Sequence, residues 1–178
     1  MTRVSSWLMV IIAVVLAVLV GGRAMSAQDK YTLKVPNGLA FSEFKGYEDW
    51  QTVAVSQTGD TIEVILGNPA MINAYRAGVP GNGKHFPDGA KMAKIHWKAK
   101  KSTEAPAPTT VPDTLHDLDF MERDSKRFPD TGGWGYAQFN YDAASDTFAP
   151  LGNDAKCGYG CHTIVAAKDY VFTAYGKR

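Results

Sequence analysis

The chain has 178 residues, which predicts a single domain, and its hydrophobic and charged fractions of 45% and 21% are those of an ordinary globular protein. The formal net charge is +1, and the lysines and arginines are spread along the chain with no basic run beyond residues 98–101. This charge pattern gives no support to a nucleic-acid-binding function.

Residues 1–27 have the features of a secretory signal peptide. Arg3 supplies the positive start, and residues 7–20 form an apolar run of about 14 residues, shorter than the roughly 20 that cross a membrane. Small residues within 24–27 offer a cleavage site. We therefore expect export to the periplasm and a mature domain of residues 28–178. The alternative is an uncleaved membrane anchor, because the cleavage positions are not a clean Ala-x-Ala.

The first half of the mature chain predicts a β-hairpin followed by one helix. Residues 44–50 are rich in aromatic side chains and predict a short helix or turn. Residues 53–55 and 61–66 are rich in β-branched side chains, which predicts two antiparallel strands joined by a tight turn. Residues 70–77, after Pro69, predict a helix of about two turns that ends before a loop rich in Gly and Pro.

Strict alternation predicts the main strand of the second half, over residues 91–101. One face carries Ala93, Ile95, Trp97 and Ala99, and the other carries Met92, Lys94, His96 and Lys98. Further strands are expected at residues 115–125, 134–141 and 170–175, loops at 103–112 and 142–155, and a helical turn at 164–168. The predicted fold class is mainly β (α+β), an antiparallel sheet with a few short helices.

The chain has two cysteines, Cys157 and Cys161, and His162 follows directly. Two thiols that can add to haem vinyl groups, with an adjacent imidazole as the iron ligand, are the pattern of c-type haem attachment. The usual pattern has two residues between the cysteines, whereas three stand here. Two other interpretations stay open: a disulfide, which would close a very small loop and stabilise little, and a metal or redox dithiol site.

A low-spin electron carrier needs a second strong axial ligand, and neither Met nor His follows His162. The upstream candidates in the mature chain are Met71, Met92, Met121, His85, His96 and His116. Core packing or surface exposure accounts for most of them, and His96 is the best placed near a haem. We therefore expect one covalently attached haem c with a five-coordinate iron that is open to small ligands.

Several segments, in this order, resemble the cytochrome P-460 family. They are residues 86–94, residues 124–128, Trp134, the Cys-His segment and residues 169–173. The resemblance covers most of the mature chain. It implies an antiparallel β-sheet haem c domain, usually a periplasmic homodimer, and the related gas-binding cytochromes c′ of the β-sheet type share this fold.

The resemblance also implies oxidation of hydroxylamine, with nitric oxide chemistry, and electron transfer to a periplasmic acceptor. In this family a lysine nitrogen bonds to the haem edge, and the matching position here is Lys94, with Lys91 as the fallback. Hydroxylamine oxidation further benefits from a carboxylate that takes up protons. No residue aligns cleanly with it, and we take Asp154 first, with Asp146 and Glu122 as other candidates. Without such a carboxylate, the alternative is a protein that binds nitric oxide without catalysis.

Overall fold

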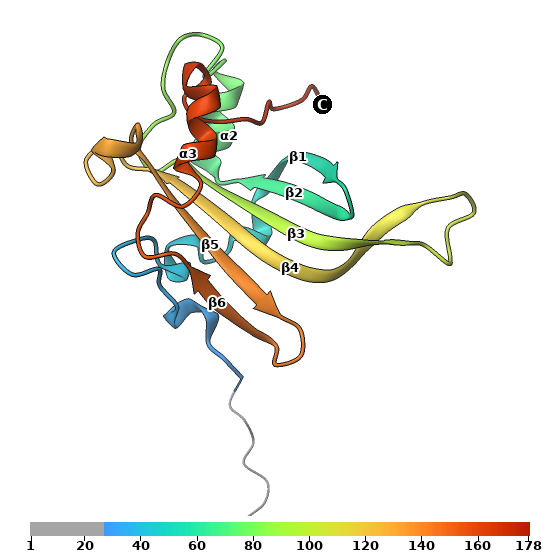
Figure 1. The fold of residues 1–178 in the computed structure, drawn as a ribbon. Helices are drawn as coiled ribbons and strands as arrows, with labels where there is room; N and C mark the ends of the chain where they lie inside the picture. Colours follow the sequence, from blue (N-terminus) through green and yellow to red (C-terminus); the bar gives the residue numbers. More distant parts are fainter. Residues whose placement is uncertain (1–26) are drawn as a thin grey trace, which may run out of the picture.

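Six strands form one antiparallel sheet in which every strand pairs with its neighbours in the sequence (Figure 1). The strands are β1 (Gln51–Thr58), β2 (Thr61–Gly67), β3 (Lys91–Lys101), β4 (Thr110–Arg123), β5 (Trp134–Asp142) and β6 (Thr147–Leu151). Short turns join β1 to β2 and β5 to β6, as antiparallel pairing allows, and longer loops join β3 to β4 and β4 to β5. The connection between β2 and β3 contains an α-helix. The predicted mainly β fold with a few short helices is confirmed.

The structure is a computed structural model, and it describes residues 27–178. The predicted signal peptide, residues 1–27, therefore lies outside the described residues except for Ala27. No helix in the described part of the chain is long and apolar enough to cross a membrane.

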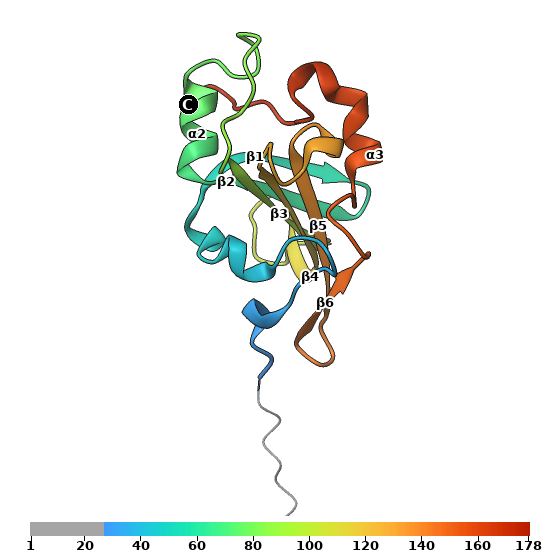
Figure 2. The same ribbon diagram turned by 90° about the vertical axis from the view of Figure 1, so that its left-hand side faces the viewer.

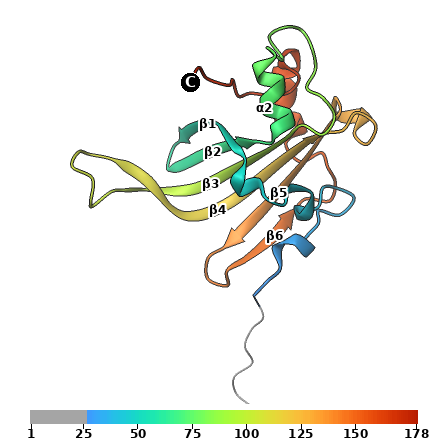
Figure 3. The same ribbon diagram turned by 180° about the vertical axis from the view of Figure 1, so that it is seen from behind.

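The N-terminal segment lies against one face of the sheet (Figure 3). Its aromatic side chains belong to the hydrophobic cluster on that face. Its 3-10 turns are η1 (Lys30–Thr32), η2 (Phe41–Phe44) and η3 (Tyr47–Asp49), as the aromatic-rich segment predicts. Phe44 stacks on Phe120 with 4.2 Å between ring centroids, and Phe41 packs edge-on against Phe120 and Phe139. Such pairs are worth about 0.5–1.5 kcal/mol each beyond the burial of their area. This face is thus closed by hydrophobic packing.

Helix α2 (Pro69–Arg76) lies on the opposite face and confirms the helix predicted from Pro69. The Asn68 side chain caps it by accepting a hydrogen bond from the Met71 amide at 3.0 Å, and Pro69 occupies the first turn, where it loses no hydrogen bond. Within the helix, the Met71 side chain is fully buried, and the Tyr75 ring stacks on the ring of Tyr175. Figure 2 shows α2 and a second helix, α3 (Tyr159–His162), at the same end of the sheet.

The prediction of a last strand at residues 170–175 is wrong. After α3 the chain forms η5 (Thr163–Lys168), and then Asp169 and Tyr170 adopt left-handed backbone angles, with φ of 52° and 63°. These angles turn the chain back toward α2, where the Thr173 carbonyl accepts a hydrogen bond from the Tyr75 hydroxyl at 2.8 Å. The segment therefore packs across the helix instead of adding to the sheet.

Two strand boundaries also differ from the sequence prediction. Strand β4 begins at Thr110, before the predicted residue 115, and carries Pro112 opposite Ala99, next to an irregularity in the β3–β4 register. Strand β6 lies within the predicted loop 142–155 and pairs with β5 along the edge of the sheet. A short 3-10 turn, η4 (Pro129–Thr131), links β4 and β5.

Candidate functional site

A cavity of about 580 Å³ lies between the α2 side of the sheet and the C-terminal segment. Sites for small organic ligands and cofactors usually enclose about 300–1,000 Å³. Its floor consists of side chains from β2 to β5, and its wall contains Cys157, Cys161 and His162. The fold thus brings the Cys-His segment onto the face of the sheet that carries Lys94.

The polarity of the floor changes from row to row. Met92 and Met121 are cross-strand partners next to Tyr136, and they form an apolar row. In the next row Lys94 pairs with Asp119. Alternate residues of neighbouring strands point to the same face of a sheet, so these side chains meet in the cavity. One part of the floor is apolar, and the adjoining part carries charge.

The cysteines stand on either side of a tight backbone turn. Gly158 has φ of +87°, a conformation that glycine adopts without strain, and it forms the N-cap of α3. The amides of Cys161 and His162 both donate to the Gly158 carbonyl at 3.0 Å. The additional residue between the cysteines is thus absorbed by one helical turn that starts at a left-handed glycine. The thiols of Cys157 and Cys161 are both free, and burial raises the pKa of the Cys157 thiol.

The surroundings of His162 favour its neutral form, which can bind a metal. Its Nδ1 lies 2.6 Å from the Tyr170 carbonyl oxygen, and burial lowers the pKa of the imidazole. The ring packs against Tyr136 and Phe172, with centroids 4.8 and 4.9 Å away. A carbonyl can only accept, so Nδ1 carries the proton and Nε2 keeps the lone pair that a metal needs.

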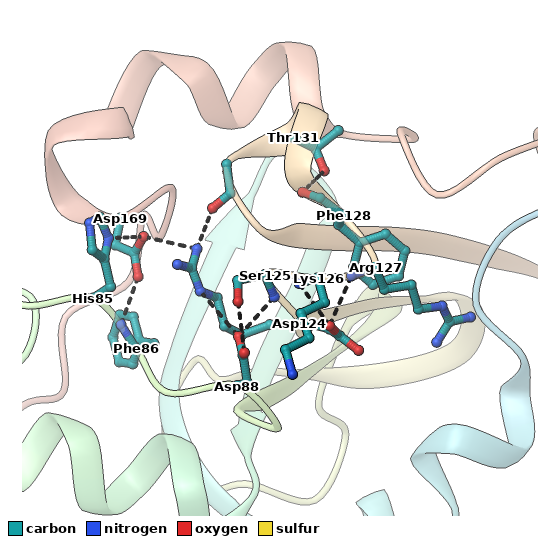
Figure 4. A network of polar contacts seen from close by, with 12 residues as sticks. His85, Phe86, Asp88, Asp124, Ser125, Lys126, Arg127, Phe128, Thr131 and Asp169 are labelled. Carbon is teal, nitrogen blue, oxygen red and sulfur yellow. Dashed lines mark hydrogen bonds and ion pairs between the residues drawn. The ribbon is translucent and has the colours of Figure 1, made fainter.

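A buried polar network supports the loop that carries this carbonyl (Figure 4). The Asp169 carboxylate accepts the Phe86 amide at 2.7 Å, and it lies 2.7 Å from His85 Nδ1 and 3.4 Å from Arg123 Nη1. Arg123 Nη1 also donates to the Gly132 carbonyl. Asp169 is almost completely buried, and the three donors satisfy its charge.

Lys94 lines the cavity and is paired there with Glu63, with Nζ and Oε2 3.0 Å apart. The Ser56 hydroxyl donates to the same carboxylate at 2.7 Å. Burial acts to raise the pKa of Glu63, but the Ser56 and Lys94 hydrogen bonds lower it below its usual range. Lys91, the fallback, bonds the Glu43 carbonyl at 2.7 Å on the opposite face of the sheet.

Two carboxylates, Glu63 and Asp119, line the cavity, and Asp154, the residue predicted from the sequence, does not. Asp154 is exposed outside the cavity lining, where its Oδ1 accepts a hydrogen bond from the Lys156 amide at 2.8 Å. Asp119 lies beside Lys94 on the cavity floor, and burial raises its pKa to about 6. A carboxyl group with this pKa exchanges protons near neutral pH.

The two other predicted carboxylates also lie elsewhere. Asp146 accepts a hydrogen bond from the Tyr141 hydroxyl in the exposed turn between β5 and β6. Glu122 pairs with Lys91 at 3.2 Å, away from the cavity. Asp119 lies in a segment whose alternating pattern predicted a strand. That Asp119 stands opposite Lys94, however, follows only from the register between β3 and β4.

The six candidate axial ligands divide into three groups. Met92 and Met121 line the apolar part of the cavity. Met71 is fully buried beneath α2, outside the cavity lining. Each of the three histidines contacts a carboxylate: His85 contacts Asp169, and His96 and His116 both contact Asp117.

The cavity fits a haem. It offers two free thiols, a neutral imidazole with Nε2 available, and apolar contacts from Ile65, Val171 and Phe172. Phe172 is 48% exposed beside His162 and adds apolar surface to the cavity lining. Fold and cavity together define a β-sheet protein with a haem pocket.

The comparisons agree with this class. The family model described as Cytochrome P460 matches residues 44–173, so the chain belongs to the cytochrome P460 family and is a haem-binding protein. No curated protein matches the chain. The matched residues include all six strands and both helices, and they contain the Cys-His segment, Lys94 and Asp119.

Proposed function

We propose that the protein is an exported mono-haem c oxidoreductase that oxidises hydroxylamine and passes the electrons to a periplasmic acceptor. The observation that carries this proposal is the position of Asp119, a carboxylate with a raised pKa, beside Lys94 in the haem cavity. Oxidation of hydroxylamine removes protons as well as electrons, and a proton acceptor whose pKa lies near the working pH is the most effective.

The Cys-His segment is assigned the attachment of the cofactor. Cys157 and Cys161 form the thioether bonds, and His162 binds the iron through Nε2. The haem iron, when bound, supplies a redox centre with an open coordination position. Tyr170 fixes the tautomer of His162, and the Tyr136 and Phe172 rings restrict its rotation.

Asp119 is assigned the proton chemistry. Above its pKa of about 6 it is ionised and accepts protons that substrate nitrogen and oxygen atoms release. Before the cross-link forms, the Lys94 ammonium paired with Glu63 favours the ionised carboxylate of Asp119. The cross-link removes this positive charge. The apolar row of Met92 and Met121 excludes water from the other part of the floor.

Lys94 is also assigned the cross-link to the haem edge. In this step the amine nitrogen bonds to a ring carbon, one N–H and one C–H bond break, and two protons and two electrons leave. The reaction therefore needs an external two-electron oxidant of the peroxide class. Lys94 lines the cavity, whereas Lys91 lies on the opposite face, so Lys94 is the lysine that can reach the cofactor.

The alternative function, binding of nitric oxide without catalysis, was favoured by the lack of an assignable carboxylate, and Asp119 supplies one. The test compares hydroxylamine oxidation by the purified periplasmic holoprotein with that of its D119N and D119E variants, using an artificial electron acceptor. We expect the rate to fall on the order of 100-fold in D119N and to be partly kept in D119E. Unchanged oxidation in D119N would remove Asp119 from the reaction. A holoprotein that binds nitric oxide but never oxidises hydroxylamine would establish the alternative.

A further inference from the structure

Beyond Lys94 and Asp119, the polar part of the cavity floor continues into a line of titratable groups that ends at the surface. His96 Nδ1 bonds to one carboxylate oxygen of Asp117, and His116 Nδ1 bonds to the other. His96 also faces both carboxylates of the cavity lining: its Nδ1 is 3.9 Å from Asp119, and its Nε2 is 3.9 Å from Glu63. A single buried imidazole thus stands between the cavity and a second carboxylate.

Exposure is lowest in the middle of this line. The His96 and Asp117 side chains are only 11% and 6% exposed, whereas Asp119 at the cavity end is 41% exposed and His116 is 54% exposed. Asp119 and Glu63 line the cavity at the inner end. The groups therefore connect the cavity to solvent through a stretch of protein that bulk water scarcely enters.

The charges around this line come from three strands. Strand β2 contributes Glu63, strand β3 contributes Lys94 and His96, and strand β4 contributes His116, Asp117 and Asp119. Three carboxylates thus face one lysine and two imidazoles. Burial acts to raise the pKa of Asp117, but its hydrogen bonds with His96 and His116 lower it.

We propose that His96, Asp117 and His116 form a proton relay between the haem cavity and the solvent. The proposal rests on the proposed function and extends it, because it supplies a route for protons between the solvent and the cavity that Glu63 and Asp119 line. An imidazole suits this role since it can receive a proton on one nitrogen and release another from the second nitrogen. A carboxylate with one oxygen on each imidazole joins the two rings.

The transfer balances as a simple proton shift. A proton on Glu63 passes to Nε2 of His96, whose Nδ1 then releases a proton to Asp117. Asp117 passes it to His116, and His116 releases it to water. Only O–H and N–H bonds form and break, and one proton moves from the cavity to solvent. Each imidazole ends in its other tautomer and returns to the first before the next transfer. The same steps run in reverse when the cavity takes up a proton.

The test follows proton movement without hydroxylamine. Flash reduction of the ferric holoprotein lowers the charge of the iron by one, which raises the proton affinity of nearby carboxylates. A pH-indicator dye in weakly buffered solution then reports the rate of proton uptake. Failure of the proposed hydroxylamine chemistry leaves this measurement intact, so the two proposals are tested separately.

His116 is the first position to change because it is exposed, so its replacement leaves the core intact. We expect H116A to slow proton uptake on the order of 100-fold, and we expect added non-coordinating buffer to restore the rate. H96Q should be equally slow but should not recover with buffer, because His96 is buried. The different response to buffer separates a relay from a merely structural role.

Asp113 offers a control, since it is a 40% exposed ionisable group on the same strand as His116 and pairs with Lys100 at 2.7 Å. Asp113 does not line the cavity, so uptake in D113N should be as fast as in the unchanged protein and independent of buffer. Proton uptake at the wild-type rate in both H116A and H96Q would overturn the relay. So would an equal slowing in D113N, or an unchanged holoprotein that takes up no proton on reduction.

Discussion

The main-chain carbonyl of Tyr170 lies 2.6 Å from Nδ1 of His162 and fixes which ring nitrogen can bind a metal. Tyr170 and the preceding Asp169 both have left-handed backbone angles, which are costly for residues other than glycine. The buried hydrogen bonds of Asp169 hold this conformation (Figure 4). The orientation of His162 thus depends on a carboxylate seven residues further along the chain.

Replacing the Asp169 carboxylate should lower the stability of the fold and weaken the bond between His162 and the haem iron. D169N keeps the shape of the side chain but removes the charge that pairs with Arg123, and breaking a buried ion pair costs about 3–5 kcal/mol. We expect the free energy of unfolding, measured by urea denaturation, to fall by about 3 kcal/mol. We also expect resonance Raman spectra of the reduced holoprotein to show a weaker iron–histidine bond.

Asp88 provides the control for this prediction. It is a half-exposed carboxylate 3.9 Å from the Nε atom of the same Arg123. Because exposed ion pairs contribute little, D88N should lower stability by less than about 1 kcal/mol and leave the iron–histidine signal unchanged. Equal effects of D88N and D169N would show that the burial of Asp169 has no special importance.

Lys94 and Lys91 give a second matched pair. K94A should produce a holoprotein that keeps its thioether-bound haem but lacks the red-shifted absorption band of a cross-linked cofactor. K91A should keep that band, because Lys91 is bonded to Glu43 on the other face of the sheet. Absorption spectra and intact mass of both variants show which lysine forms the cross-link. A red-shifted band that survives in K94A would exclude this residue as the cross-link.

The contrast between Lys94 and Asp119 shows how far the sequence could predict the site. The face on which Lys94 lies follows from the two-residue period of β3 alone, and the prediction agreed with the structure. The position of Asp119 depends on the register between β3 and β4. The hairpin that sets this register has irregularities next to Trp97, which no local pattern in the sequence indicates.

The C-terminal segment was misread for a related reason. Residues 170–175 are rich in aromatic and β-branched side chains, as strands are, but the left-handed Asp169 and Tyr170 direct the chain toward α2. Nothing in the local sequence requires a left-handed tyrosine, since the buried contacts of Asp169 stabilise it from distant parts of the chain. The prediction failed where long-range polar contacts determine the backbone.

The pKa of Asp119 predicts opposite pH trends for activity and stability. Burial raises this pKa to about 6, from an ordinary value of 3.8. Hydroxylamine oxidation needs the ionised acceptor, so kcat/KM should rise with pH through a midpoint near 6. Because the pKa is raised by folding, the stability that Asp119 contributes is fully present below about pH 4 and is lost as the pH passes 6.

D119N removes this titration. Compared with the unchanged protein, the variant should gain relative stability as the pH rises from about 4 to 7, with part of the effect screened because the side chain is 41% exposed. Urea denaturation at a series of pH values measures the trend. Parallel stability curves for the two proteins would mean that the Asp119 pKa is not raised in the folded state.

Substitutions of the two glycines between the cysteines test how the chain accommodates the additional residue. Gly158 has φ of +87°, so G158A forces a side chain into a strained backbone conformation and should lower covalent haem attachment. Gly160 has helical backbone angles, and a Cβ built there meets no atom within 4 Å, so G160A should attach haem normally. The pyridine haemochrome yield per mole of purified protein measures attachment. The helical turn after Gly158 is what accommodates three residues between Cys157 and Cys161, so equal yields from the two variants would contradict this explanation of the spacing.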